Sequence, residues 1–189
     1  MWLPVETVTA SASDWCSLAD AKTYLRADGD DEDVILALMI KSAGEHVEAI
    51  TSMRLMEQEL LLTASSFSDL AQLPVAPVMD VTAVAILTPE GERVTVDPQV
   101  WELSGSSLTP SIRTKNGMSW PSIALAPDAI QIKAVAGHSD AAKIPAPVIQ
   151  ACFLLLGDFY EHREDSQARS LSSVPNGVMT LLTNYRRWI

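Results

Sequence analysis

Serine, histidine and aspartate stand side by side at His138-Ser139-Asp140, and these are the three residue types of a hydrolase triad. A working triad needs the three groups to converge from separate segments, so that each hydrogen bonds to the next. Three adjacent residues on a turn do not meet that requirement, and Gly137 before them favours a turn. We therefore predict a turn here and no catalytic residue.

The acidic run from Asp28 to Asp33 has the composition of a calcium-binding loop. An EF-hand loop requires a glycine at its sixth position and a glutamate at its twelfth. Counted from Asp28, those positions hold Asp33 and Met39, so the spacing fails. We predict instead that the acids open a helix, because the dipole at a helix start favours negative charge.

Two side chains that can bind metal, Asp158 and His162, lie four residues apart. A zinc site of this kind needs a second imidazole at ligand spacing, which neither His46 nor His138 provides. The pair is therefore predicted to be a helix-surface ion pair, worth about 0.3–0.5 kcal/mol. The eight glycines form no phosphate-binding loop either. We predict no catalytic residue, no metal and no cofactor, and hence a protein that is not an enzyme.

The last five residues are Tyr185, Arg186, Arg187, Trp188 and Ile189, and we call them the C-terminal tail. Tyrosine, tryptophan and arginine are the residue types that dominate the hot spots of protein interfaces. An apolar segment of this kind is costly to leave in water. Two interpretations stay open, because the tail can fold back onto its own domain or dock into a groove of a partner protein.

The totals describe an ordinary globular chain with an unusual charge. Its 189 residues are 48% apolar and 20% charged, and the formal net charge is −11. Residues 1–63 carry 12 acids and 4 bases, whereas residues 145–189 carry 4 of each. Such acidity opposes free binding to nucleic acid, which needs clustered cations. It suits either plain solubility or a channel through which DNA slides without sticking.

The two cysteines, Cys16 and Cys152, form neither a disulfide framework nor a metal site, so we expect a reducing compartment. The N-terminal residues show no basic-then-apolar pattern of a leader, so secretion is not expected. The longest apolar run, Ala151 to Leu156, is too short to cross a bilayer, so no membrane partner is predicted.

Local patterns predict two helices after an extended arm at residues 1–16. Ser17 is a helix N-cap candidate with Asp20 three residues later, and Gly29 is predicted to end that helix. A second helix is expected up to Thr51, with Glu45 and Glu48 on its wet side. Its predicted buried stripe consists of Ile35, Leu38, Met39, Ser42, Val47 and Ile50.

The middle of the chain changes to the period of strands. Strands are expected at 58–63, at 81–87 with a hairpin return at 93–96, at 101–103, at 107–109 and at 130–135. Pro145 and Pro147 then open a long apolar helix, since proline is tolerated in a first turn. A polar loop at 164–174 and a last short helix from Pro175 follow.

The predicted fold class is α+β: a helical bundle formed by the N- and C-terminal helices, with an inserted antiparallel β lobe. We expect a single domain over 1–189. It comprises an extended arm at 1–16, helices at 17–55, the β lobe at 56–143, and helices with the docking tail at 144–189.

Several segments together resemble a known family. The opening from Ser17 to Arg26, Ala43-Gly44-Glu45-His46-Val47-Glu48, Leu73 to Val78, Ile144 to Ile149, and Pro175 to Trp188 are similar to tailed-phage head–tail connector proteins. These are also called adaptor or head-completion proteins, and similar ones occur in gene transfer agents. The resemblance spans roughly 170 residues by order of motifs along the chain; residues 116–128 match no motif of the family.

The resemblance implies a structural virion protein that forms a ring beneath the portal protein, with twelve copies as the usual number. Such a ring extends the DNA channel, lets double-stranded DNA pass without specific binding, and provides the platform for a stopper or tail-completion protein. It also implies location in the virion neck, in the host cytoplasm before assembly, and an origin in a phage, a prophage or a gene transfer agent.

On this interpretation the C-terminal tail docks on the portal protein, and the acids Asp28, Asp30, Asp31, Glu32 and Asp33 face the channel lumen. The arm at 1–16 and the loop at 164–174 are expected to become ordered on assembly. One alternative is a non-enzymatic binding or regulatory module that docks its tail on another protein. Another is a hydrolase whose site converges only in the folded chain.

Overall fold

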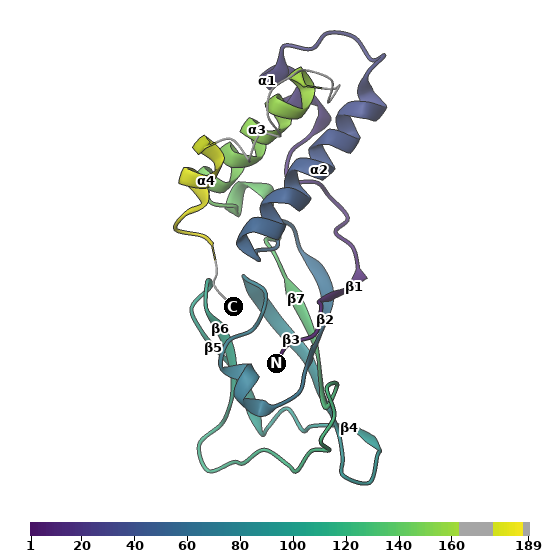
Figure 1. The fold of residues 1–189 in the computed structure, drawn as a ribbon, viewed down its shortest axis with the longest axis vertical. Coiled ribbons are helices and arrows are strands. Elements are labelled where there is room, and N and C mark those ends of the chain that lie inside the picture. The colour runs from purple at the N-terminus through teal and green to yellow at the C-terminus, as the bar shows by residue number, and fades with distance from the viewer. Residues whose placement is uncertain (163–175, 187–189) are drawn as a thin grey trace. The chain divides into compact units, whose positions relative to one another are not determined.

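The computed structural model describes residues 1–162 and 176–186, which fold as two compact units (Figure 1). One unit comprises Met1–Ala12 and Glu57–His138 and contains every strand found among the described residues. The other comprises Ser13–Met56 and the described residues from Ser139 onward, and it contains all four α-helices. The predicted α+β class is confirmed, with helices from both ends of the chain and the strands inserted between them.

A five-stranded antiparallel sheet forms the β unit, with the strand order β1-β2-β7-β3-β4. Its strands are β1 (Glu6–Thr9), β2 (Gln58–Ala64), β3 (Val78–Leu87), β4 (Arg93–Thr95) and β7 (Ile130–Ala136). The central strand β7 pairs with β2 on one side and with β3 on the other. The hairpin predicted between 81–87 and 93–96 is confirmed by the pairing of β3 with β4.

Alternation of side chains along β7 explains how the sheet holds the core of this unit. Ile130, Ile132, Ala134 and Ala136 are buried on one face, as the period of two in a strand requires. They pack in a cluster with buried residues of the neighbouring strands, among them Leu60, Leu62, Val84 and Ile86.

A two-stranded sheet and a short helix complete the β unit. The hairpin pairs β5 (Trp101–Gly105) with β6 (Pro110–Thr114), and it packs against the 3-10 helix η1 (Phe67–Ala71). The strand predicted at 107–109 is wrong, because the amide of Thr109 bonds to the carbonyl of Ser106 and closes a turn. The second strand of the hairpin begins one residue later, at Pro110.

The N-terminal arm differs from the expectation that residues 1–16 become ordered only on assembly. Within the single chain, Glu6–Thr9 pairs with β2 as β1, and Trp2 forms an isolated bridge to Ala64. Residues from Ser13 onward belong instead to the helical unit, where Trp15 is buried.

The first helix, α1 (Leu18–Leu25), begins as predicted, because the Ser17 hydroxyl accepts the amide hydrogen of Asp20. It ends earlier than predicted: the left-handed cap is Arg26, with φ of 55°, and Gly29 lies in the following loop. The second helix, α2 (Asp33–Thr51), ends one residue before a left-handed Ser52.

The predicted buried stripe of α2 is wrong for most of its members. The buried residues are Leu36, Ile40, Ala43, Gly44, Val47 and Thr51, whereas Ile35 and Leu38 are exposed. The reason is that small residues let another side chain approach closely. A Cβ on Gly44 would lie 2.8 Å from Cδ1 of Trp15, and the Trp15 indole donates a 2.8 Å hydrogen bond to the carbonyl of Ile40.

The C-terminal helices are α3 (Ala146–Glu161) and α4 (Asn176–Leu182). The start of α3 agrees with the prediction, since Pro145 is its N-cap residue and Pro147 lies in its first turn. Helix α3 packs against α2 and α4 (Figure 1). Its buried residues are Val148, Ala151, Cys152, Leu155 and Leu156. Among the described residues, no helix is both long and apolar enough to span a membrane.

Candidate interaction surfaces

The exposed face of α2 carries three large apolar side chains that are largely open to solvent. Val34 is 88% exposed, Leu38 62% and Ile35 48%, and we call these three residues the α2 stripe. Positions 34 and 38 are one helical turn apart, and at about 100° per residue Leu38 lies nearly opposite Ile40 on α2, whereas Val34 lies about 80° from Gly44. Isolated apolar residues are common on protein surfaces, but three within two turns of a helix form a patch suited to a partner.

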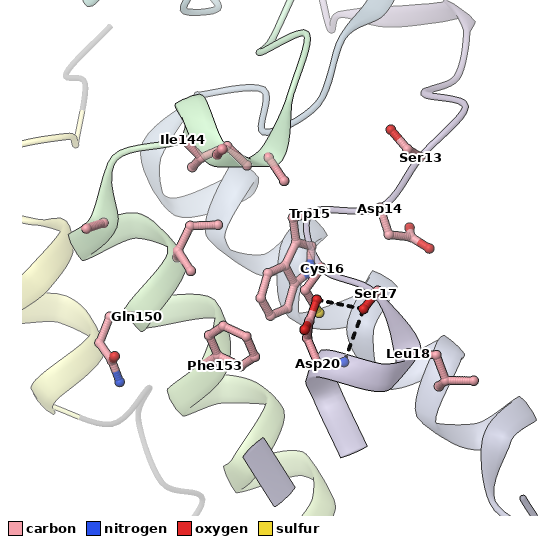
Figure 2. A pocket seen from close by; sticks show the side chains of 14 residues that line it. Ser13, Asp14, Trp15, Cys16, Ser17, Leu18, Asp20, Ile144, Gln150 and Phe153 are labelled. Atoms are coloured by element: carbon pink, nitrogen blue, oxygen red, sulfur yellow. Dashed lines mark hydrogen bonds between the residues drawn. The ribbon is translucent and has the colours of Figure 1, made fainter. Parts of the chain in front are cut away.

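An open pocket of about 880 Å³ lies in the same unit, and we call it the α1–α3 pocket (Figure 2). It is lined by residues of the segment before α1, of α1 itself, of the 3-10 helix η2 (Ala141–Lys143) and of α3. The Trp15 and Phe153 rings meet edge to face there, with centroids 4.9 Å apart. The apolar side chains of Leu18, Ile144 and Ile149 complete most of the lining.

The Ser17 and Asp20 side chains in the α1–α3 pocket stabilise the start of α1. The Ser17 hydroxyl donates to the Asp20 carboxylate over 2.6 Å and accepts from the Asp20 amide, which fixes the start of α1 (Figure 2). Burial, with help from nearby Asp20 and Asp14, raises the pKa of the Cys16 thiol to about 12, so the thiolate is scarce. An activated nucleophile would need the opposite shift.

The five acids predicted to face the lumen lie at the end of the α1–α2 loop and the start of α2. Asp28, Asp30 and Asp31 are exposed, and Glu32 and Asp33 are half-buried.

Internal partners already engage part of this acidic segment. The Lys22 ammonium lies 2.8 Å from Asp30 and 2.5 Å from Asp33, and the Tyr160 hydroxyl donates to Glu32 over 2.9 Å. The hydrogen bond from Lys22 holds the pKa of Asp30 below its usual value. The net negative charge that this segment presents to another molecule is therefore smaller than the count of five carboxylates suggests.

The C-terminal tail is described only in part. The amides of Tyr185 and Arg186 both donate to the carbonyl of Leu182 over 2.9 Å, and Tyr185 is half-buried while Arg186 is exposed. The remaining tail residues, Arg187, Trp188 and Ile189, lie outside the described residues, as does the predicted loop at 164–174.

The other candidate chemical groups have structural partners. Asp140 caps η2 by accepting the amide hydrogen of Ala142, and the Lys143 ammonium donates to the Ser139 hydroxyl. The predicted pair on α3 is confirmed, with His162 Nδ1 3.3 Å from Asp158 Oδ1. In the part of the chain that the structure describes, no three His, Cys, Asp or Glu side chains gather to hold a metal ion.

Sequence reasoning missed both the α2 stripe and the α1–α3 pocket. Helical spacing of apolar residues places Ile35 and Leu38 in the predicted buried stripe, and that prediction does not include Val34. The small residues Ala43 and Gly44 are the signal that another side chain packs closely on that side of the helix. A single sequence does not show that this side chain is Trp15, which lies far away along the chain.

These described units define an α+β protein whose notable surfaces are suited to docking. No protein-family model matches the chain, and no curated protein matches it by sequence. Three solved structures match it along nearly its full length, covering 99% of this chain and 97% of theirs. They are chains from the neck of an empty gene transfer agent particle computed with C6 symmetry (TM-score 0.80, 27% identity), a native gene transfer agent virion (0.79, 28%), and the neck of a native particle computed with C12 symmetry (0.77, 26%).

The resemblance that the sequence indicated is thereby confirmed: the chain is similar over nearly its full length to neck and virion chains of gene transfer agents, which is consistent with the head–tail connector family.

Proposed function

We propose that this chain is a structural, non-enzymatic protein of a virion neck, and that it serves there as the head–tail adaptor. The observation that carries the proposal is the match over 99% of the chain to chains from gene transfer agent necks. A match over both units supports a shared role more strongly than a shared core alone would, because surface elements agree as well.

In the proposed arrangement, copies of the chain form a closed ring below the portal protein and above a stopper or tail-completion protein. The C6 and C12 symmetry of the matched necks supports a ring, and twelve copies is the number we propose. A ring of identical copies closes through head-to-tail contacts, in which two different patches of each copy meet. The chain is made in the host cytoplasm and joins the neck during assembly.

The acidic segment from Asp28 to Asp33 is proposed to border the DNA channel. Carboxylates repel phosphates, so DNA passes without sticking. The triple change of Asp28, Asp30 and Asp31 to lysine tests this, since all three side chains are exposed, and circular dichroism checks that loss of the Lys22–Asp30 ion pair leaves the chain folded. Particles with the triple variant should release DNA more slowly than wild type, and unchanged release would remove these acids from the channel wall.

The C-terminal tail is proposed to dock on the portal protein, with Arg186 and Arg187 pairing with acids there. Deletion of residues 185–189 is the test, with the change of Arg186 and Arg187 to glutamine as a milder companion. Truncated protein should stay folded but fail to join portal-bearing heads. If it still joins heads and yields DNA-delivering particles, the tail is not the docking element.

The proposal as a whole is tested by locating the chain in purified particles. Electron microscopy of the neck should show a ring that the two units fit. Particles that contain none of the chain, or purified protein that turns over a small molecule, would refute it.

A further inference from the structure

We infer that the α2 stripe of one copy inserts into the α1–α3 pocket of the next copy, and that this contact joins neighbouring copies in the ring. The inference rests on the proposed ring and adds the surfaces that would build it. The occupant we assign to the pocket is therefore a second copy of this chain, presented through Val34, Ile35 and Leu38.

The two patches have complementary shapes. The stripe protrudes, since its side chains are 48–88% exposed on a helix, and the pocket is an open hollow of about 880 Å³. Its lining of Trp15, Phe153, Ile144 and Ile149 is mostly apolar. Aromatic residues in a pocket that receives aliphatic anchors are typical of the energetic centre of an interface.

The two patches are different surfaces of one copy. Trp15 contacts the buried side of α2, through the carbonyl of Ile40 and the backbone of Gly44. The stripe lies on the exposed side of the same helix and is not part of the pocket lining. A head-to-tail contact joins two different patches in this way.

One cation beside the stripe suits the acids of the pocket. Lys41 lies on the exposed face of α2 beyond Leu38 and is about two-thirds exposed. The charged residues that line the pocket are Asp14 and Asp20, so Lys41 can pair with Asp14 of the neighbouring copy. The acids Asp30 to Asp33 precede Val34 at the other end of the stripe, so the contact must keep them outside the pocket. Pairs at the rim of an interface contribute more to register than to affinity.

A small-molecule ligand fits the pocket less well. Such sites place a few polar groups so that they converge on the ligand. Here Ser17 and Asp20 satisfy each other in the cap of α1. An aliphatic stripe needs no such groups.

The first test is the change Leu38→Asp, supplied in cells that assemble the particles. A carboxylate in an apolar pocket is strongly disfavoured, so the amount of the chain in purified particles should fall at least about tenfold. Met79→Asp is the matched control, because Met79 is 53% exposed on β3, in the other unit. It should enter particles at the wild-type level. Circular dichroism should show both variants folded, since neither side chain is buried.

The second test is a disulfide trap within assembled particles. Leu38→Cys and Gln150→Cys are combined in a Cys16→Ser background, because Gln150 is exposed and lines the pocket. Oxidation should give a ladder of covalently linked copies, and Met79→Cys with Gln150→Cys should give none.

The outcomes separate the two ideas. Absence of wild-type protein from particles would overturn the neck function, and this inference with it. Normal presence of Leu38→Asp, or presence of the paired-cysteine variant without a ladder, would overturn only the stripe-to-pocket contact, and the stripe would then face a different neck protein.

Discussion

Two glycines in helix interiors should respond to alanine in opposite directions, because only one of them has a neighbour in the way. Alanine is favoured over glycine inside a helix by about 1 kcal/mol. At Gly157 of α3 the added methyl would lie 3.6 Å from Tyr24, an ordinary contact. At Gly44 of α2 it would lie 2.8 Å from Cδ1 and 3.0 Å from Nε1 of Trp15.

The Trp15 ring cannot easily move aside. It is only 4% exposed, its indole donates to the carbonyl of Ile40, and Phe153 packs against it. Overpacking of this kind costs about 1–3 kcal/mol, which exceeds the gain in helix propensity. We therefore expect Gly44→Ala to lower the free energy of unfolding by up to about 2 kcal/mol, and Gly157→Ala to raise it by up to about 1 kcal/mol.

Urea unfolding followed by circular dichroism measures both changes. In a chain of this size, 1 kcal/mol corresponds to roughly 2–4 °C in the melting temperature, so thermal scans should separate the two variants clearly. In a Trp15→Leu background the penalty at Gly44 should largely disappear, because the obstructing ring is gone. Equal stabilisation by both alanines would refute the close approach of Trp15 to α2.

Three further changes test other contacts. Glu48 accepts the Leu55 amide and pairs with Arg54, but burial outweighs these contacts and raises the pKa of its carboxyl. Ionisation of Glu48 therefore opposes folding. The free energy of unfolding of the wild type should fall relative to that of Glu48→Gln as the pH rises from the pKa of the unfolded chain through the raised pKa of the folded chain. Parallel pH profiles of the two proteins in urea titrations would contradict this. Tyr160→Phe removes the 2.9 Å hydrogen bond to the Glu32 carboxylate and should cost about 1.5–3 kcal/mol in urea unfolding, whereas an unchanged midpoint would mean that water replaces the bond. Ile132→Ala empties a fully buried site on the central strand and should cost about 2–5 kcal/mol, with a smaller loss arguing that the β core collapses around it.

The sequence by itself determined most of the elements of this protein. Ser17 with Asp20 marked the start of α1, paired prolines marked the start of α3, and alternation marked β7, because caps, proline and strand period act over a few residues. The order of motifs along the chain also indicated the family. The capping, proline and strand signals depend on residues close together in the chain, and the family signal depends on the order of motifs. None of them requires knowing which distant residues are in contact.

Only the tertiary structure decided which faces are buried. Both sides of α2 carry apolar residues. The buried side is the one where Gly44 leaves room for the ring of Trp15, a residue from outside the helix. That choice leaves Val34, Ile35 and Leu38 in water, and the same packing opens the pocket beside Phe153. Close approach between segments far apart in the chain depends on the fit of particular atoms, and hydrophobic periodicity carries no information about that fit.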